Sequence, residues 1–307
     1  MLLALLAFAA GWARSSEAAR TLVMEQVARL EGPAADPMSQ PTDVVVTSAG
    51  AAWVLDGVHM RLARFSPEGR FERYVKLEGP VLDDRRLPVG LGIDAAGRLL
   101  VGDRQRGTIQ RLQGNGAVES TIAIPRDPEE RPADPTDVMP SPSGQTLLVV
   151  DNDNHCVKEI DAAGQLVRRI GRRGSGPGEM NYPATVALAA AGEMAVVDVL
   201  NARVDVFDRE GRALRAIGSQ GVVAGKFYRP KGVAMDRSGR LHVGDSFTGL
   251  IQAFGLDGQL IGVWGTAGGQ PHRLKSPATI LADASGQFYV VEMLANCVTV
   301  WRERGKP

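Results

Sequence analysis

Apolar and polar residues alternate in short runs along most of this chain. Val186 and Leu188 stand two positions apart in one such run, and Val233 and Met235 do so in another. A period of two places every second side chain on the same face, which is typical of a β-strand with one buried face. Glycine and proline residues separate the runs and mark turns. The pattern predicts an all-β chain of many short strands.

Six copies of one unit follow each other along the chain. A proline marks the same place in each copy, at intervals of 47 or 48 residues. A glycine follows each proline after nine residues, and an acidic residue closes the next apolar run, two residues after a valine. The prolines are Pro41, Pro88, Pro135, Pro183, Pro230 and Pro277, and the acids are Asp56, Asp103, Asp151, Asp198, Asp245 and Glu292. A period of this length is the signature of a repeat architecture.

The chemistry of these repeated residues suits strands and turns. Proline fixes φ and has no N–H, so it suits the first residue of a strand. The glycine suits a turn that needs a positive φ. The acidic side chain can accept hydrogen bonds from backbone N–H groups in the turn that follows it. We therefore expect the six repeat acids to be structural.

Two more strands complete each copy. The third strand carries an aliphatic residue and, three positions later, a larger apolar residue, as in Val204 and Phe207. A further glycine turn leads to a fourth strand, such as residues 213–217. One copy is thus a four-stranded antiparallel meander, which is a propeller blade. The sequence predicts a six-bladed β-propeller with blades that start near residues 41, 88, 135, 183, 230 and 277.

The two ends of the chain predict how the ring closes. The sixth copy ends after its third strand, at residues 297–302. Residues 22–30 form an apolar run with no blade of their own, so residues 21–31 are predicted to supply the missing fourth strand of the last blade. The propeller would then span residues 21–307.

One stretch of the fourth copy resembles a known repeat family. The run Val196-Val-Asp-Val-Leu-Asn-Ala-Arg-Val-Asp-Val-Phe207 resembles an NHL repeat, and the glycine-rich connection over residues 171–183 is similar to the linker of that family. The resemblance covers nearly all of residues 22–307 and implies a secreted, bacterial-type NHL-repeat propeller. Glu292 in place of Asp, and a proline-rich insert over residues 125–135, depart from the family pattern. Because one fold hosts many functions, the resemblance is specific for fold and weak for function.

The first residues read as a targeting segment. Residues 1–13 form an apolar run that is shorter than the roughly 20 residues needed to span a membrane. Its length, with small residues at Gly11 and Ala13, fits a secretory signal, so residues 1–20 are predicted to be a signal peptide and leader. A buried N-terminal segment or a signal anchor is the alternative. No later apolar run is long enough to span a membrane, and we expect a secreted or periplasmic protein.

Charge and cysteine content exclude two classes of protein. The chain has 35 Lys and Arg residues against 35 Asp and Glu residues, whereas nucleic-acid binding favours a basic excess. Cys156 and Cys297 each follow the acid of their repeat by five residues, in the third and sixth copies. Those copies would lie on opposite sides of a six-membered ring, too far apart for the roughly 7 Å that a disulfide allows. We predict two free thiols.

Polar residues just after the blade-start prolines are candidates for channel chemistry. Peptide-amidating lyases, which resemble this fold, place metal-binding histidines there, but this chain has none at those positions. Asp43 and Asp137 each stand two residues after a proline, and Thr136 and Lys231 stand one residue after. Paired carboxylates are oxygen ligands of the type that Ca²⁺ prefers. A turn or strand-start role for both aspartates remains open.

The loops around the mouth of the channel carry candidate binding residues. Aromatic and arginine side chains are enriched in recognition sites. The candidates are Tyr182, Tyr228, Arg229, Arg104, Arg106, Asn154, His155 and Asn201.

Three functions are compatible with this pattern. The first is a non-enzymatic binding or scaffold module for a protein, peptide or glycan, with no cofactor. The second is a metal-dependent lyase or lactonase with its site in the central channel, using Asp43, Asp137, Thr136 and Lys231. The third is a purely structural role within a larger envelope assembly.

Overall fold

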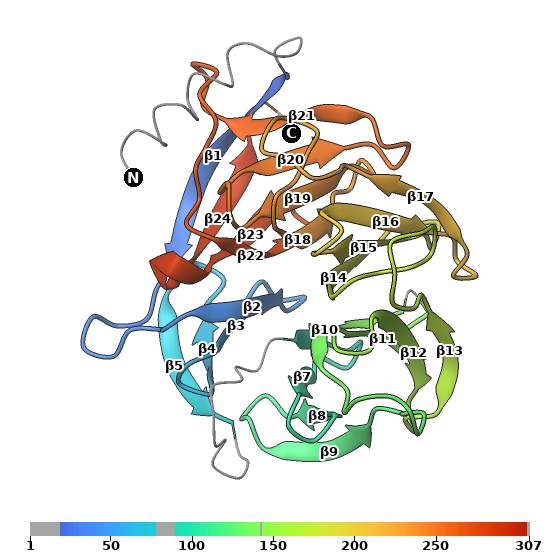
Figure 1. The fold of residues 1–307 in the computed structure, drawn as a ribbon. Coiled ribbons are helices and arrows are strands. Elements are labelled where there is room, and N and C mark those ends of the chain that lie inside the picture. Colours follow the sequence, from blue (N-terminus) through green and yellow to red (C-terminus); the bar gives the residue numbers. More distant parts are fainter. Residues whose placement is uncertain (1–18, 78–89, 142, 306–307) are drawn as a thin grey trace.

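The computed structural model describes residues 19–77, 90–141 and 143–305 (Figure 1). The predicted signal peptide lies outside this range except for its last two residues. The blade-start residue Pro88 also lies outside it. In the described part of the chain, no helix is both long enough and apolar enough to cross a membrane.

The first four repeats form four separate antiparallel sheets of four strands each. Their strands are β2 (Pro41–Val46), β3 (Ala52–Asp56), β4 (Arg61–Phe65) and β5 (Phe71–Lys76); β6 (Leu91–Ile93), β7 (Leu99–Asp103), β8 (Thr108–Leu112) and β9 (Val118–Ala123); β10 (Pro135–Pro140), β11 (Thr146–Asp151), β12 (Cys156–Asp161) and β13 (Leu166–Ile170); β14 (Pro183–Leu188), β15 (Met194–Asp198), β16 (Arg203–Phe207) and β17 (Ala213–Ile217).

The last two repeats share one eight-stranded sheet with the N-terminal strand. Along this sheet the strands are β18 (Pro230–Met235), β19 (Leu241–Asp245), β20 (Ile251–Phe254), β21 (Leu260–Gly265), β1 (Thr21–Leu30), β24 (Cys297–Glu303), β23 (Gln287–Glu292) and β22 (Pro277–Ala282). A short 3₁₀ helix, η1 (Met293–Ala295), lies between β23 and β24.

The prediction of six separate blades closed by an N-terminal strand is wrong. The all-β propeller is confirmed, but it consists of four separate sheets and one continuous eight-stranded sheet. β1 pairs antiparallel with β24 over residues 24–30 and parallel with β21 over residues 21–23. The sequence pattern had assigned only one neighbour to this strand. Because β21 would otherwise present an unpaired edge, its backbone groups pair with β1 and merge the two repeats.

Apolar clusters between neighbouring sheets form the core. One cluster joins residues of β2, β3 and β4 to residues of β22, β23 and β24. Another joins β15 and β16 to β18, β19 and β20. The aliphatic and larger apolar positions of the third strands, such as Val204 and Phe207, are fully buried. Second strands such as β15 are buried on both faces, as radial packing of sheets requires.

The first strand of every repeat lies at the centre of the molecule (Figure 1). β2, β6, β10, β14, β18 and β22 each lie beside the next, and β22 lies beside β2. These six inner strands form a ring around a central channel. β2, β10, β14, β18 and β22 all begin at their repeat proline, as predicted.

The repeat acids fasten loops to the sheets. Asp245 accepts hydrogen bonds from the backbone N–H groups of Phe247 and Thr248 in the turn that follows it, as predicted. Its other oxygen accepts from Tyr228 and Arg229, in the loop before the inner strand. The acids Asp56, Asp151, Asp198 and Glu292 accept a backbone N–H from the equivalent preceding loop. These five repeat acids are therefore structural, and each fixes the entry to an inner strand.

The two cysteines lie at the starts of β12 and β24. Both are buried and both are free thiols. Burial raises the pKa of each thiol to about 12, so neither is a reactive thiolate at neutral pH.

Candidate functional site

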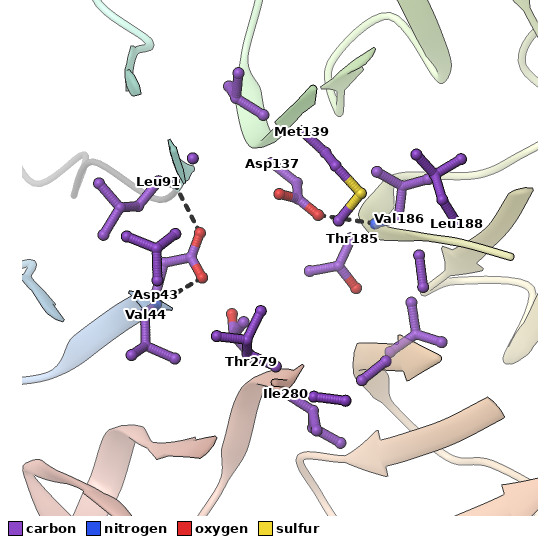
Figure 2. Close-up of a pocket in the computed structure, with 18 of the residues that line it drawn as sticks. Asp43, Val44, Leu91, Asp137, Met139, Thr185, Val186, Leu188, Thr279 and Ile280 are labelled. Carbon is purple, nitrogen blue, oxygen red and sulfur yellow. Dashed lines mark hydrogen bonds between the residues drawn. The ribbon is translucent and has the colours of Figure 1, made fainter. Parts of the chain in front are cut away.

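A cavity of about 260 Å³ lies in the central channel and is lined by all six inner strands (Figure 2). Four of its lining residues are polar at the side chain: Asp43, Asp137, Thr185 and Thr279. Their side chains point toward the middle of the cavity from β2, β10, β14 and β22. Each stands two residues after its repeat proline. The cavity therefore has a polar zone set by one position of the repeat.

Asp43 is held by two backbone donors. Its Oδ1 accepts from the N–H of Val44 at 2.8 Å. Its Oδ2 accepts from the N–H of Leu91, on the neighbouring strand β6, at 2.7 Å. The side chain is buried, with 4% of its surface exposed. These bonds fix the orientation of the carboxyl group toward the channel.

Asp137 occupies the equivalent place on β10. Its Oδ2 accepts from the N–H of Val186, on β14, at 2.9 Å. Asp137 is half-buried as a residue, whereas Asp43 is buried. It is therefore the carboxyl group of the pair that a bound molecule can reach more easily.

Thr185 and Thr279 occupy the same repeat position as the two aspartates, but they donate hydrogen bonds where the aspartates accept them. The hydroxyl of Thr185 donates to the carbonyl of Lys231 at 2.7 Å, and the hydroxyl of Thr279 donates to the carbonyl of Thr42 at 3.0 Å. Each polar residue of the zone thus bonds to the backbone of the next inner strand. The four polar residues therefore line the channel and also hold neighbouring inner strands together.

Burial raises the pKa of both carboxyl groups. The pKa of Asp43 lies well above its ordinary range because the group is desolvated and because the charge of Asp137 disfavours its ionisation. Desolvation also raises the pKa of Asp137, to about 7. The raised pKa values keep part of this pair protonated at neutral pH. One partner can then donate a proton while the other accepts one.

Apolar side chains form the rest of the cavity wall. We call Ile93, Met139, Leu188, Met235 and Leu281 the apolar collar. All five lie near the ends of inner strands, four or five residues after a repeat proline, and all are half-buried. They stand two or three residues further along their strands than the polar position. Among the described lining residues there is no Lys, Arg or His.

The predicted metal residues are brought together only in part. Asp43 and Asp137 line the same cavity, whereas Thr136 and Lys231 do not line it. The hydroxyl of Thr136 donates to the carbonyl of Ala184 at 2.8 Å, so it fastens β10 to β14. Burial lowers the pKa of the Lys231 ammonium group, with a smaller effect from Arg229.

The donor set does not fit a resident Ca²⁺ well. Ca²⁺ takes six to eight oxygen ligands, and the cavity offers two carboxyl groups and two hydroxyl groups. Both oxygens of Asp43 already accept backbone N–H groups, and both hydroxyl groups are donated to carbonyls. In the described residues, no group of three or more His, Cys, Asp and Glu side chains could hold a metal ion. The oxygens of this cavity therefore serve mainly as partners of the backbone.

The predicted binding residues lie outside this cavity, and two of them, Tyr182 and Tyr228, each pack against another ring. The rings of His155 and Tyr182 lie 4.5 Å apart, and the Tyr182 N–H bonds to His155 Nδ1. The rings of Tyr228 and Phe247 lie 4.2 Å apart, and both are exposed. The structure thus gathers parts of the predicted surface rather than one continuous site.

The remaining predicted binding residues hold loops. Asn154 is buried and bonds to the backbone of Arg131, and Asn201 bonds to the carbonyl of Gly174. Arg104 pairs with Asp134 and Asp153, and Arg106 pairs with Asp103. Arg229 donates its backbone N–H to Asp245. None of the eight predicted binding residues lines the central cavity.

The apolar collar is the part of the site that sequence reasoning missed. A signal for part of it exists, because the fifth residue after every repeat proline is apolar, and Ile93, Leu188 and Met235 of the collar stand at this position. The residues at this position are Val46, Ile93, Pro140, Leu188, Met235 and Ala282. An apolar residue at this position is also what ordinary strand alternation predicts, so it does not indicate a cavity.

Solved structures of similar fold include several enzymes. A gluconolactonase from Xanthomonas campestris matches with a TM-score of 0.65 at 17% identity, covering 94% of this chain and 98% of that one. A catalytically inactive virginiamycin B lyase from Staphylococcus aureus, solved with quinupristin, matches with a TM-score of 0.63 at 14% identity, covering 92% and 90%. A hydrazine synthase from Kuenenia stuttgartiensis matches with a TM-score of 0.60 at 13% identity, covering 88% and 97%. At these identities the likeness shows the fold alone.

Comparisons of sequence gave no match. No protein-family model matches the chain, and no curated protein matches it. The NHL resemblance is therefore not confirmed.

The comparisons correct the leading functional prediction. The sequence favours a non-enzymatic binding or scaffold module, whereas the named structures of similar fold are enzymes. The alternative prediction, a lyase or lactonase with its site in the channel, agrees better with these findings.

Proposed function

We propose that this protein is an enzyme that opens a cyclic ester in its central channel by general acid–base catalysis. The observation that carries the proposal is the pair of Asp43 and Asp137, two coupled carboxyl groups with raised pKa values in one cavity. An acid or base is most effective when its pKa lies near the working pH, and the pKa of Asp137 lies at about 7. A strongly perturbed group in a cleft is a site candidate on physical grounds.

The two carboxyl groups have different roles because their surroundings differ. Asp43 is the more buried group and its pKa is raised by two causes, so it keeps its proton and acts as the acid. Asp137 is open to the cavity and ionises near neutral pH, so it acts as the base. The backbone bonds to both side chains hold them in place before a substrate binds.

Two ring-opening reactions fit this pair. In hydrolysis, Asp137 takes a proton from water, the water oxygen bonds to the carbonyl carbon, the ring C–O bond breaks, and Asp43 protonates the departing ring oxygen. In elimination, Asp137 takes a proton from the carbon next to the one that bears the ring oxygen. The C–O bond then breaks, and the departing carboxylate receives the proton of Asp43.

The fold comparisons lend support to this class of reaction. One structure of similar fold is titled a gluconolactonase and others are titled streptogramin B or virginiamycin B lyases. The proposal for this chain rests on its own residues, since those proteins share at most 17% identity with it.

The test is an assay of the purified protein with a panel of lactones, read by mass spectrometry. Hydrolysis gives a hydroxy acid that is heavier than the lactone by one water, whereas elimination gives an unsaturated acid of unchanged mass. We expect D43N and D137N each to lower kcat by about 10²–10⁴-fold, the usual contribution of an acid or base. Asp127→Asn, in an exposed loop, is the matched control and should keep full activity.

Treatment with a chelator separates this route from a metal-dependent one. We expect turnover to survive dialysis against EGTA. Loss of turnover that Ca²⁺ restores would contradict the proposed route and assign Asp43 and Asp137 as calcium ligands. Full activity in D137N would also overturn the proposal.

The repeats are inferred to be of the NHL type, and the protein to be secreted or periplasmic. The motif over residues 196–207 and the apolar run over residues 1–13 support these two inferences. N-terminal sequencing of the mature protein from cells tests the second one. A mature chain that begins near residue 20 is expected, and a chain that retains residue 1 would contradict it.

A further inference from the structure

The side chains of the apolar collar offer no hydrogen-bonding groups to the hydroxyl groups of a sugar. Its five side chains come from five of the six inner strands, β6, β10, β14, β18 and β22, so it lines the cavity on most sides. They belong to the half-buried residues of their strands. A ligand that covers them removes apolar surface from water, which favours an apolar group at this place.

Charge near the cavity disfavours an anionic ligand. The two ionisable side chains in the described lining are both acidic. The turns that follow three of the inner strands also carry acids, at Asp94, Asp236 and Asp283. Asp94 pairs with Arg98, and Asp236 pairs with Arg240, so these arginine charges are already engaged. A carboxylate or phosphate in the channel would meet no cation among the described lining residues.

The size of the cavity limits the ligand. A volume of about 260 Å³ lies just below the lower end, about 300 Å³, of sites for drug-sized ligands. The ligand is therefore small, such as one ring with a short chain.

We infer that the substrate is a small, uncharged cyclic ester with an apolar side chain, whose ring lies at Asp43 and Asp137 and whose chain lies in the apolar collar. That the substrate is a cyclic ester rests on the proposed function. The preference for an uncharged, apolar molecule over a sugar lactone or an anionic lactone rests on the cavity wall alone.

The test measures binding and not turnover, so it holds even if the protein opens no ester. The probes are δ-lactams, which resemble δ-lactones in shape but resist opening, with alkyl chains from none to six carbons. Calorimetry gives their affinities. We expect affinity to rise about fourfold for each methylene that the collar buries, and then to level off when the cavity is full. A lactam that carries a carboxylate on its chain should bind at least tenfold more weakly than its uncharged equivalent.

Two collar variants and one control make the test specific. L188N and Met235→Gln should each lower affinity for a long-chain lactam by about fivefold or more, and leave that for the lactam without a chain nearly unchanged. Leu214→Asn, on the outer strand β17 and 48% exposed, should change neither affinity. Thermal melting of each variant shows that it is folded, and Met235→Gln is the milder change if L188N does not fold.

The outcomes separate the two claims. Chain-dependent binding without turnover of any lactone would contradict the proposed function and keep this inference. Turnover of lactones with affinity independent of the chain, or tighter binding of gluconolactam than of the alkyl lactams, would overturn this inference and keep the proposed function.

Discussion

At the scale of single residues, the site depends on one repeat position filled in three ways. The second residue after the proline is Asp in two repeats, Thr in two and Gly in two. Asp accepts a backbone N–H from the next strand, whereas Thr donates to a backbone carbonyl. Only the aspartates add ionisable groups, and the cost of burying them appears as raised pKa values. The residues that fasten the ring are therefore the ones that give the channel its chemistry.

The raised pKa of Asp137 predicts how stability depends on pH. Asp has a pKa near 3.9 in an unfolded chain and Asp137 has one of about 7 in the fold, so the folded state holds its proton more tightly. The stability associated with this proton is complete below pH 4 and is lost as the pH rises through 7. D137N has no such proton to lose. Relative to the wild type, it should gain up to about 4 kcal/mol in free energy of unfolding between pH 4 and pH 8.

Urea denaturation of both proteins at pH 4 and at pH 8 checks this. The comparison cancels the pH dependence of all groups that the two proteins share. An equal difference in stability at both pH values would show that Asp137 has an ordinary pKa.

At the scale of elements, the inner strands approach each other closely where glycine replaces the polar residue. A Cβ atom on Gly232 would lie 2.9 Å from the backbone nitrogen of Ile280 and 3.0 Å from the carbonyl oxygen of Ala278. A Cβ atom on Gly90 would lie equally close to the backbone of β10. Polar side chains thus hold some neighbours in the ring, and direct backbone approach holds others.

Because the strands lie so close at Gly232, we expect a single added methyl group to destabilise the fold. Gly232→Ala should lower the free energy of unfolding by about 1–3 kcal/mol, since the backbone atoms that it meets cannot move aside easily. Gly114→Ala is the matched control, because nothing lies within 4 Å of its Cβ position. Equilibrium unfolding compares the two. If Gly232→Ala proves as stable as Gly114→Ala, the strands do not pack as closely as described.

β1 is the element that joins two repeats into one sheet. Leu22 in β1 is 2% exposed and packs in a cluster with Trp264 and Ile280. L22A should cost about 2–5 kcal/mol, as a buried Leu→Ala change usually does. Val27→Ala, at a position that is 41% exposed, should cost less than about 0.5 kcal/mol. Similar melting temperatures for both variants would mean that β1 is not an integral strand.

The elements also show which features a sequence can predict. Strand starts were predictable because proline lacks an N–H and fixes φ, and β14 begins at Pro183 as expected. The parallel pairing of β1 with β21 was not predictable, since it involves backbone groups of residues 21–23 whose side chains carry no signal for it. Asp43 and Asp137 were found from their repeat position, but the cavity between them depends on how six strands close into a ring.

At the scale of the whole molecule, the channel gathers residues that lie far apart in the chain. Asp43 and Asp137 are separated by two repeats, and only the ring brings both to one cavity. The same ring sets the collar around them, so one cavity combines two carboxyl groups of raised pKa with an apolar wall. The mouth loops, which carry Tyr228 and His155, lie outside this cavity and do not contribute to its chemistry.

The central claim is that Asp137 belongs to a carboxyl pair that keeps a proton near neutral pH. Infrared spectroscopy of the protonated carboxyl band between pH 5 and pH 9, in the wild type and in D137N, tests it without any substrate. Burial also raises the pKa of Asp205 to about 7, but that group is present in both proteins and cancels in the difference. We expect a band in the difference spectrum that disappears with an apparent pKa near 7. Identical titration of the two proteins above pH 5 would contradict it.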